Sequence, residues 1–173
     1  MAIEKGSMRE VIDAVYQILI NDEEVLRLLW YKPKRISGKD PLDPSLPNIL
    51  ELDEEAYWDI VDERIMLQPK VSDIVDNPIC RLYITSGRRR SLSNNYYIAK
   101  QQIIINTYVH EEYLGDMRSE SIADRLAQLL ALENLSGAIG KLNHVKSDPY
   151  EAPTQYQRFQ HVYEYTDMKK QGL

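Results

Sequence analysis

Two short stretches of the sequence come close to motifs with known chemistry, and each lacks a residue that the chemistry requires. Residues 110–112 read His-Glu-Glu, the beginning of a zinc-protease helix, but the second histidine is replaced by Leu114. Residues 137–141 resemble a phosphate-binding loop, but the glycines are too close together and Leu142 stands where a magnesium-binding hydroxyl is needed. We therefore expect neither a zinc site nor a nucleotide site in these stretches.

The other side chains that could act as nucleophiles or metal ligands are scattered. The single cysteine, Cys80, falls on the apolar side of an alternating stretch, where a buried and unreactive thiol is usual. His110, His144 and His161 lie on separate predicted strands or strand ends, which favours structural roles. The carboxylates of residues 53–63 lack the glycine turn of a calcium loop, so a solvated helix face explains them more simply. We expect no catalytic residue, metal or cofactor, and no enzyme.

Three consecutive arginines are harder to explain in a monomer. Arg88, Arg89 and Arg90 precede a serine- and asparagine-rich stretch at the predicted tip of a hairpin, in a chain whose net charge is −6. Three interpretations stay open: a solvated turn, a contact with DNA phosphates, or salt bridges to an acidic face of another subunit. The candidate acidic partners are residues 53–55 and residues 111–112.

Helical periodicity marks the elements that must position these residues. Residues 7–10 contain a Ser/Glu capping box, and apolar residues follow at helical spacing as far as residue 19. A second short helical run covers residues 25–30. A further helix begins at residues 115–116, and Ser-Gly at residues 136–137 is its expected end.

Alternating polar and apolar residues predict four strands. Residues 80–85 alternate strictly, residues 96–110 are rich in β-branched and aromatic side chains, and the polar connector between them indicates a long antiparallel hairpin. Two more strands are expected at residues 142–146 and 159–165. The fold class is therefore α+β, with a mainly antiparallel four-stranded sheet and helices packed on one face. The helix residues expected in the core are Val15, Leu19, Ile122, Leu126 and Leu129.

We expect one α+β domain spanning residues 1–173, in which residues 31–77 form an extended insertion. Four prolines and a glycine in residues 31–52 oppose regular helix, whereas residues 53–77 are compatible with a helix or a strand. A connection of about twenty residues without secondary structure is uncommon, so this proline-rich stretch is either mobile or held by a partner. The apolar side chains expected to dock a partner are Trp30, Tyr31, Leu42, Leu46 and Ile49.

The composition is that of a folded chain with an unusual aromatic content. Hydrophobic residues make up 43% and charged residues 28% of the 173 residues, which excludes wholesale disorder, and no apolar run approaches a membrane span of about 20 residues. The net negative charge repels nucleic acid as a whole, so any contact with DNA has to be local. Twelve tyrosines against one phenylalanine indicate either partner contacts or the solvent side of a sheet. A single cysteine fits a reducing cytoplasm.

The order of the elements resembles that of the tail terminator (tail completion) proteins of long-tailed bacteriophages. The resemblance rests on the amphipathic helix at residues 11–19, the hairpin at 79–109, the helix at 121–130 and the strand at 156–165. It covers about two thirds of the chain and is a likeness of order and pattern, without a signature motif.

The resemblance implies a structural virion protein that forms a homohexameric ring, terminates the tail tube and joins it to the neck or capsid connector. The implied partners are copies of the chain, the tail tube protein and neck proteins, with non-specific contact to DNA in the channel and no membrane. The implied location is the tail–neck junction of the virion, and the host cytoplasm during assembly. Residues 31–77 are longer than the family pattern, so a head–tail connector or stopper protein is an alternative. A small cytoplasmic ligand-binding or enzymatic α+β domain is the alternative of another class.

Overall fold

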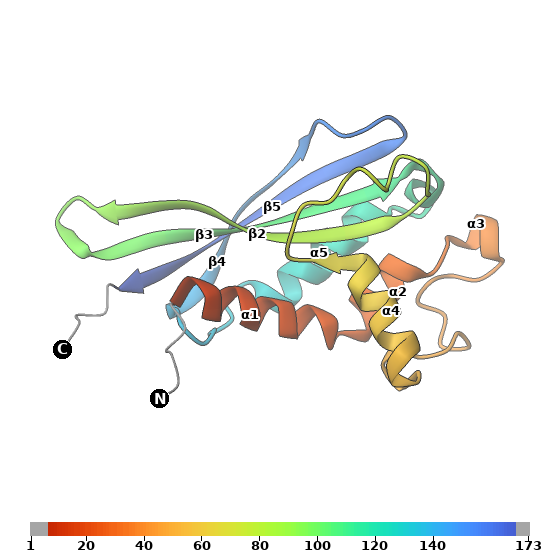
Figure 1. The fold of residues 1–173 in the computed structure, drawn as a ribbon, viewed down its shortest axis with the longest axis horizontal. Helices are drawn as coiled ribbons and strands as arrows, with labels where there is room; N and C mark the ends of the chain where they lie inside the picture. Colours follow the sequence, from red (N-terminus) through yellow and green to blue (C-terminus); the bar gives the residue numbers. More distant parts are fainter. Residues whose placement is uncertain (1–6, 169–173) are drawn as a thin grey trace.

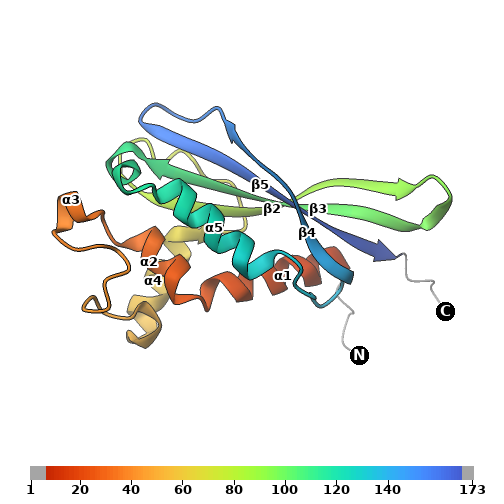
Figure 2. The ribbon, with the colours of Figure 1, turned by 180° about the vertical axis from the view of Figure 1, so that it is seen from behind.

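The computed structural model describes residues 7–168, in which helices cover one face of a twisted sheet (Figures 1 and 2). Helices α1 (Ser7–Ile20), α2 (Glu23–Trp30) and α5 (Arg118–Leu130) occupy that face, and α4 (Glu54–Arg64) contacts α2. The three helices expected from apolar periodicity are thus present. None of the helices formed by the described residues is long and apolar enough to span a bilayer.

The sheet has five strands in the order β1-β2-β3-β5-β4. Their bounds are β1 Ile65–Met66, β2 Cys80–Leu92, β3 Asn95–His110, β4 Ile139–Tyr150 and β5 Tyr156–Met168. The four long strands pair antiparallel, whereas β1 pairs parallel with β2 at the edge. The predicted strand number of four is therefore wrong, because two residues of the ambiguous stretch after α4 join the sheet and make it mixed.

The hairpin of β2 and β3 continues well beyond the helices. Its outer part, residues 87–102, which we call the arm, leads away from the helical layer and turns at residues 93–94 (Figure 1). A β-bulge between Ser86 and Arg89 lies where the arm begins. Gly87 is needed there, because a Cβ at this position would come within 2.9 Å of the side chains of Gln102 and Ile104.

The main core lies between the helices and the sheet. Of the five core residues expected from the sequence, Val15, Leu19, Ile122 and Leu126 are fully buried. Leu129 is half-buried and packs against the core, because its neighbour Leu130 takes the deeper position. The expected helical stripe is confirmed with a shift of one residue at the end of α5.

Residues 31–77 contain more regular structure than their prolines led us to expect. They form α3 (Lys34–Ser37), η1 (Ile49–Glu51), α4 and β1, so the expectation that residues 31–52 have no secondary structure of their own is wrong. Pro33 occupies the N-cap of α3, where a missing N–H costs no helical hydrogen bond. Residues 67–79 then cross the sheet face opposite the helices, and Ile74 is buried there in a second small core.

Candidate functional site

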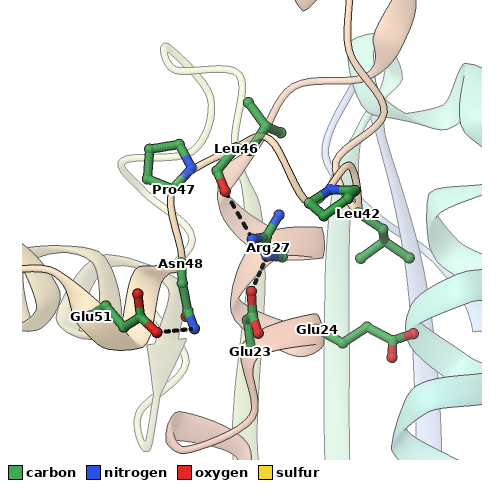
Figure 3. Close-up of a pocket in the computed structure, with 9 residues that line it drawn as sticks. Glu23, Glu24, Arg27, Leu42, Leu46, Pro47, Asn48 and Glu51 are labelled. Atoms are coloured by element: carbon green, nitrogen blue, oxygen red, sulfur yellow. Dashed lines mark hydrogen bonds and ion pairs between the residues drawn. The ribbon is translucent and has the colours of Figure 1, made fainter.

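Arg27 fixes the proline-rich stretch against α2. Its guanidinium donates hydrogen bonds to the backbone carbonyls of Asp43 at 2.9 Å and Leu46 at 3.0 Å. It also pairs with the Glu23 carboxylate at 2.5 Å (Figure 3), and it is only 6% exposed. The Tyr31 hydroxyl adds a hydrogen bond to the Pro47 carbonyl at 2.7 Å. The stretch is therefore held by contacts within its own chain in this structure, and its docking to a partner stays a prediction.

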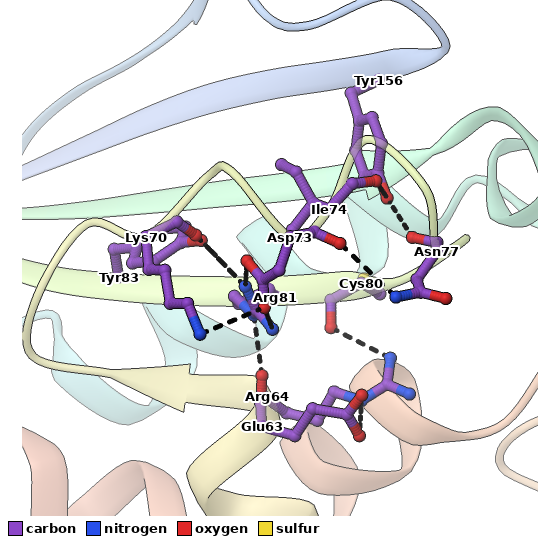
Figure 4. A network of polar contacts seen from close by, with 10 residues as sticks. All are labelled: Glu63, Arg64, Lys70, Asp73, Ile74, Asn77, Cys80, Arg81, Tyr83 and Tyr156. Atoms are coloured by element: carbon purple, nitrogen blue, oxygen red, sulfur yellow. Dashed lines mark hydrogen bonds and ion pairs between the residues drawn. The ribbon is translucent and has the colours of Figure 1, made fainter.

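Arg81 holds the backbone of residues 67–79 in place on the other face of the sheet (Figure 4). Arg81 donates to the carbonyls of Glu63 and Lys70 at 2.7 and 3.1 Å and to both carboxylate oxygens of Asp73 at 2.8 and 3.0 Å. The hydrogen bond from Arg81 lowers the pKa of the Asp73 carboxyl below its ordinary value. The Tyr156 hydroxyl lies 2.6 Å from the carbonyl oxygens of Ile74 and Asn77. All of these contacts stabilise one backbone conformation.

A groove opens between α2 and the stretch that Arg27 holds (Figure 3). It has a volume of about 680 Å³, and its walls combine carboxylates with apolar side chains. The residues that line it are Glu23, Glu24, Arg27, Leu42, Pro44, Leu46, Pro47, Asn48 and Glu51. Glu24 lies 3.4 Å from Arg125, whereas Glu51 accepts only a 3.4 Å hydrogen bond from Asn48 among the described contacts. The groove therefore suits an occupant that is both cationic and apolar.

The expected docking residues are divided between this groove and the core. Leu42 is 42% exposed and lines the groove with the half-buried Leu46. Ile49 is fully buried, so its side chain is not available to a partner in this conformation. Trp30 and Tyr31 are half-buried against the core, and the guanidinium of Arg64 lies 4.8 Å from the centre of the Trp30 ring. Two of the five residues thus face the groove.

The three consecutive arginines lie in strand β2 and not in the turn, which corrects their predicted position. All three are exposed. Arg89 pairs with the buried Asp167 of β5 at 2.7 Å, whereas no carboxylate of residues 7–168 lies within ion-pair distance of Arg88 or Arg90. Arg88 and Arg90 are thus without a carboxylate partner among the described residues.

The structure does not bring the arginines to the acidic residues that were considered as partners. Asp53 accepts a hydrogen bond from the Ala56 backbone as the N-cap of α4, and Glu112 lies 3.9 Å from Lys32. Both belong to the end of the molecule that bears α2, α3 and α4, and the arm points away from that end (Figures 1 and 2). Within one chain, the arginines of the arm and these acidic residues therefore do not meet.

The arm also carries exposed aromatic residues that sequence analysis did not single out. Tyr96 is 80% exposed and Tyr97 is 54% exposed, just after the turn. Their signal in the sequence was only the excess of tyrosine, which does not say which tyrosines are exposed. Together with Arg88 and Arg90 they make the arm a cationic and aromatic surface.

Two of the three histidines meet through the fold. The Ser147 hydroxyl lies 2.8 Å from Nδ1 of His161 and 2.9 Å from Nε2 of His144, and Thr107 lies 3.4 Å from the other His161 nitrogen. Burial lowers the pKa of His161 to about 4, so the ring is neutral at pH 7. His110 instead caps η2 (Glu111–Asp116) by accepting the Glu112 N–H. These contacts tie strands and turns together.

The thiol has the character that the sequence predicts. Cys80 is fully buried, and burial raises its pKa to about 12, so the reactive thiolate is scarce at neutral pH. No group of three or more His, Cys, Asp or Glu side chains within residues 7–168 is placed to hold a metal ion. The groove and the arm are therefore the features that call for a function, and both are suited to binding a protein surface.

Comparisons with known proteins extend this description. A family model described as YomW matches residues 22–165. The chain is also similar to the SPbeta prophage-derived uncharacterized protein YomW of Bacillus subtilis (strain 168), with 29% identity over 139 residues, 74% of this chain and 78% of that protein. Among solved structures, a chain from the virion of a native gene transfer agent particle shares the fold. The TM-score is 0.52 at 14% identity, over 94% of this chain and 98% of that one.

Proposed function

We propose that this chain, which belongs to the YomW family, is a structural virion protein of a tailed bacteriophage. The observation that carries the proposal is a fold shared, over nearly the full length of both chains, with a protein of a gene transfer agent virion. The prophage origin stated for the Bacillus relative supports a bacteriophage origin for this chain. The side-chain chemistry is consistent with a structural role, because the arginine clusters hold backbone segments in place and the Cys80 thiol is buried.

Within the virion, we assign the chain to a ring that terminates the tail tube and joins it to the neck or capsid connector. The element order that resembles tail terminators supports this role, and the arm and groove give each copy two distinct surfaces for its neighbours. The proposed partners are further copies of the chain in a hexamer, the tail tube protein and neck proteins. The proposed function is assembly, without catalytic turnover or cofactor.

The arginines of the arm have two roles compatible with a ring. In the lumen, Arg88 and Arg90 would touch DNA phosphates through contacts that carry no sequence information. Against a neighbouring subunit, they would pair with carboxylates and stabilise the assembly. Like charges repeated around a ring repel one another unless phosphates or carboxylates lie close, so either of these contacts would favour ring assembly.

Deleting the gene from the phage that encodes it separates the candidate roles, when the particles are imaged by electron microscopy and analysed by mass spectrometry. A tail terminator leaves DNA-filled heads apart from tails of irregular length. A connector or stopper, which the long segment 31–77 keeps as a second candidate, leaves heads that lose their DNA. Complete, infectious particles would contradict both virion roles and favour a ligand-binding or enzymatic domain in the host cytoplasm.

A further inference from the structure

We infer that the arm of one copy of this chain docks into the α2 groove of a second copy, and that this contact links neighbours in the ring. The inference rests on the proposed function, because it specifies which surfaces join the subunits of the proposed ring.

The arm offers cations and aromatic rings with few contacts of their own. Arg88 and Arg90 have no carboxylate partner within the described chain, and Tyr96 exposes 80% of its surface. Exposed tyrosine and arginine are the residues that most often anchor protein interfaces. Only the tip of the arm, residues 91–97, is two-stranded, because β3 also pairs with β5 from Ile98 inward, where Ala99 and Gln101 are buried. Covering this tip with a partner removes apolar and aromatic surface from solvent.

The groove offers the complementary chemistry. Glu51 and Glu24 place carboxylates along its wall, although Glu24 also lies 3.4 Å from Arg125 of its own chain. The apolar surface for aromatic rings comes from Leu42, Leu46 and Pro47. The single cation in the lining, Arg27, is already occupied by Glu23 and by backbone carbonyls, so it opposes an incoming arginine only weakly. Because Arg27 also holds the groove wall in place, the wall loses little conformational entropy when a partner docks.

The positions of the two surfaces make the contact intermolecular. The arm and α2 lie at opposite ends of the molecule (Figures 1 and 2), and the groove is lined by residues of α2 and of the stretch that follows it. An arm therefore cannot reach the groove of its own chain. A contact between two different surfaces on identical copies is heterologous, and such contacts generate closed rings when the rotation between neighbours closes.

The same arginines could serve DNA, but the whole arm fits a protein partner better. DNA contact could use the arginines and the tyrosine hydroxyls, but it would leave the carboxylate-lined groove without a role. A chain of net charge −6 also repels DNA outside the arm. A groove that combines carboxylates with leucine and proline uses both the cations and the rings. We therefore assign the arm to the neighbouring subunit.

Paired cysteines test the contact directly. The double variant Tyr96→Cys with Leu42→Cys places one thiol on the arm and one in the groove, and the native Cys80 is too deeply buried to compete. A disulfide forms only when the two Cα atoms come within about 7 Å. Under mild oxidation we expect a ladder of covalent oligomers on a non-reducing gel. The matched control pairs Tyr96→Cys with Val75→Cys, which is 61% exposed outside the groove, and should stay monomeric on the gel.

Charge reversal provides a second test that misfolding cannot imitate. Arg88→Glu with Arg90→Glu makes the arm acidic, and Glu24→Lys with Glu51→Lys makes the groove basic. Each double variant should weaken self-association, measured by sedimentation velocity, by about tenfold or more. Mixing the two variants should restore association, because acidic arms then meet basic grooves and basic arms meet acidic grooves. Controls are Arg9→Glu and Asp124→Lys, which are exposed on α1 and α5 and should change little.

The outcomes separate this inference from the function that it rests on. Rings that form without the arm-to-groove disulfide, and that tolerate both charge reversals, would overturn the inference and leave the virion role intact. Rings that persist after Arg88→Glu with Arg90→Glu but lose DNA binding would overturn it in favour of a DNA contact. A wild-type chain that stays monomeric at every concentration and is absent from particles would overturn both.

Discussion

Buried arginines fix much of the backbone in this protein. Four arginines among the described residues are 7% exposed or less, namely Arg27, Arg64, Arg81 and Arg118. All four donate to backbone carbonyls, and three of them, Arg27, Arg81 and Arg118, also hydrogen-bond to a carboxylate, so most donors of these three guanidinium groups find an acceptor. The Nε of Arg64 is buried without a hydrogen-bond partner among the described residues. Carbonyls at the ends of helices and in loops are the groups that secondary structure leaves unpaired. The arginines supply hydrogen-bond donors to backbone carbonyls at helix ends and in loops.

Arg118 is the sharpest test of this role. It is fully buried and donates to the carbonyls of Leu28 and Tyr31, so it joins α5 to the end of α2. Replacing it by methionine leaves both carbonyls and Asp116 without this donor, and we expect a loss of about 3 kcal/mol in the free energy of unfolding. Urea denaturation measures the loss. The exposed Arg9→Met serves as control, and a loss below about 0.5 kcal/mol for Arg118→Met would contradict the role.

His161 makes stability depend on pH in a defined window. Burial lowers its pKa to about 4, whereas in the unfolded chain the pKa is near the ordinary value of about 6.5. The unfolded state therefore binds more protons between these values, and stability is full above pH 6.5 and falls as the pH drops towards 4. The loss from this one group reaches at most about 3 kcal/mol. Urea midpoints measured from pH 7.5 to 4 should show this slope.

The matched variant for this prediction is His161→Gln, which keeps a polar side chain beside Ser147 but does not titrate. Its stability should change less between pH 6.5 and 4 than that of the wild type. Identical slopes in the two proteins would show that other groups cause the pH dependence.

At the scale of elements, the helices and strands that show a regular spacing of apolar residues could be predicted from the sequence. The alternation from Cys80 to Thr85 and the helical stripe through Leu126 each report a single buried face, which is a local property. Strand β1 could not be predicted, because two residues carry no period and are stabilised by pairing with Leu82 and Tyr83. The arginines were visible as a charge run, but their place in a strand depends on pairing with β3.

Helix α5 ends earlier than its sequence predicts, because of tertiary contacts. The helix was expected to reach residues 136–137, but it ends at Leu130. The Leu132 N–H donates to the Leu142 carbonyl at 2.7 Å, and Asn134 forms a β-bridge with Lys141. Residues after 130 thus pair with the start of β4, and this pairing cannot be inferred from a single stretch of sequence.

The β-bulge at the base of the arm depends on a small residue. Gly87→Ala would place a Cβ within 2.9 Å of carbon atoms of Gln102 and Ile104, and the strands must move apart to accept it. We expect a destabilisation of about 1–3 kcal/mol, with faster amide hydrogen exchange in the arm than in the core strands. Gly115→Ala is the control, because its Cβ would meet only Arg35 at 3.9 Å. Equal effects of the two changes would contradict a packing role for Gly87.

At the scale of the whole molecule, opposite chemistry lies at opposite ends. The arm (Figure 1) bears exposed tyrosines and two arginines that have no carboxylate partner among the described residues. The other end bears a groove with carboxylates, leucines and prolines (Figure 3). A molecule of this kind has a built-in direction of association. In the proposed ring, the overall acidity would keep separate copies apart except where the arm meets the groove.

Self-association should therefore weaken with salt. Raising the ionic strength from about 0.1 to 1 M shortens the screening length from about 10 Å to about 3 Å, which weakens exposed arginine–carboxylate pairs. We expect the dissociation constant to rise by about tenfold in sedimentation velocity, and the Tyr96 and Leu42 contact to provide the remaining affinity. Association that strengthens with salt would show that apolar burial alone joins the copies.

The most direct test of the virion role is electron cryomicroscopy of particles from the phage that encodes this chain. We expect a ring of copies at the junction between tail and neck, with the arm of each copy lying along α2 of the next. Purified, infectious particles that contain no copy of the chain would contradict it.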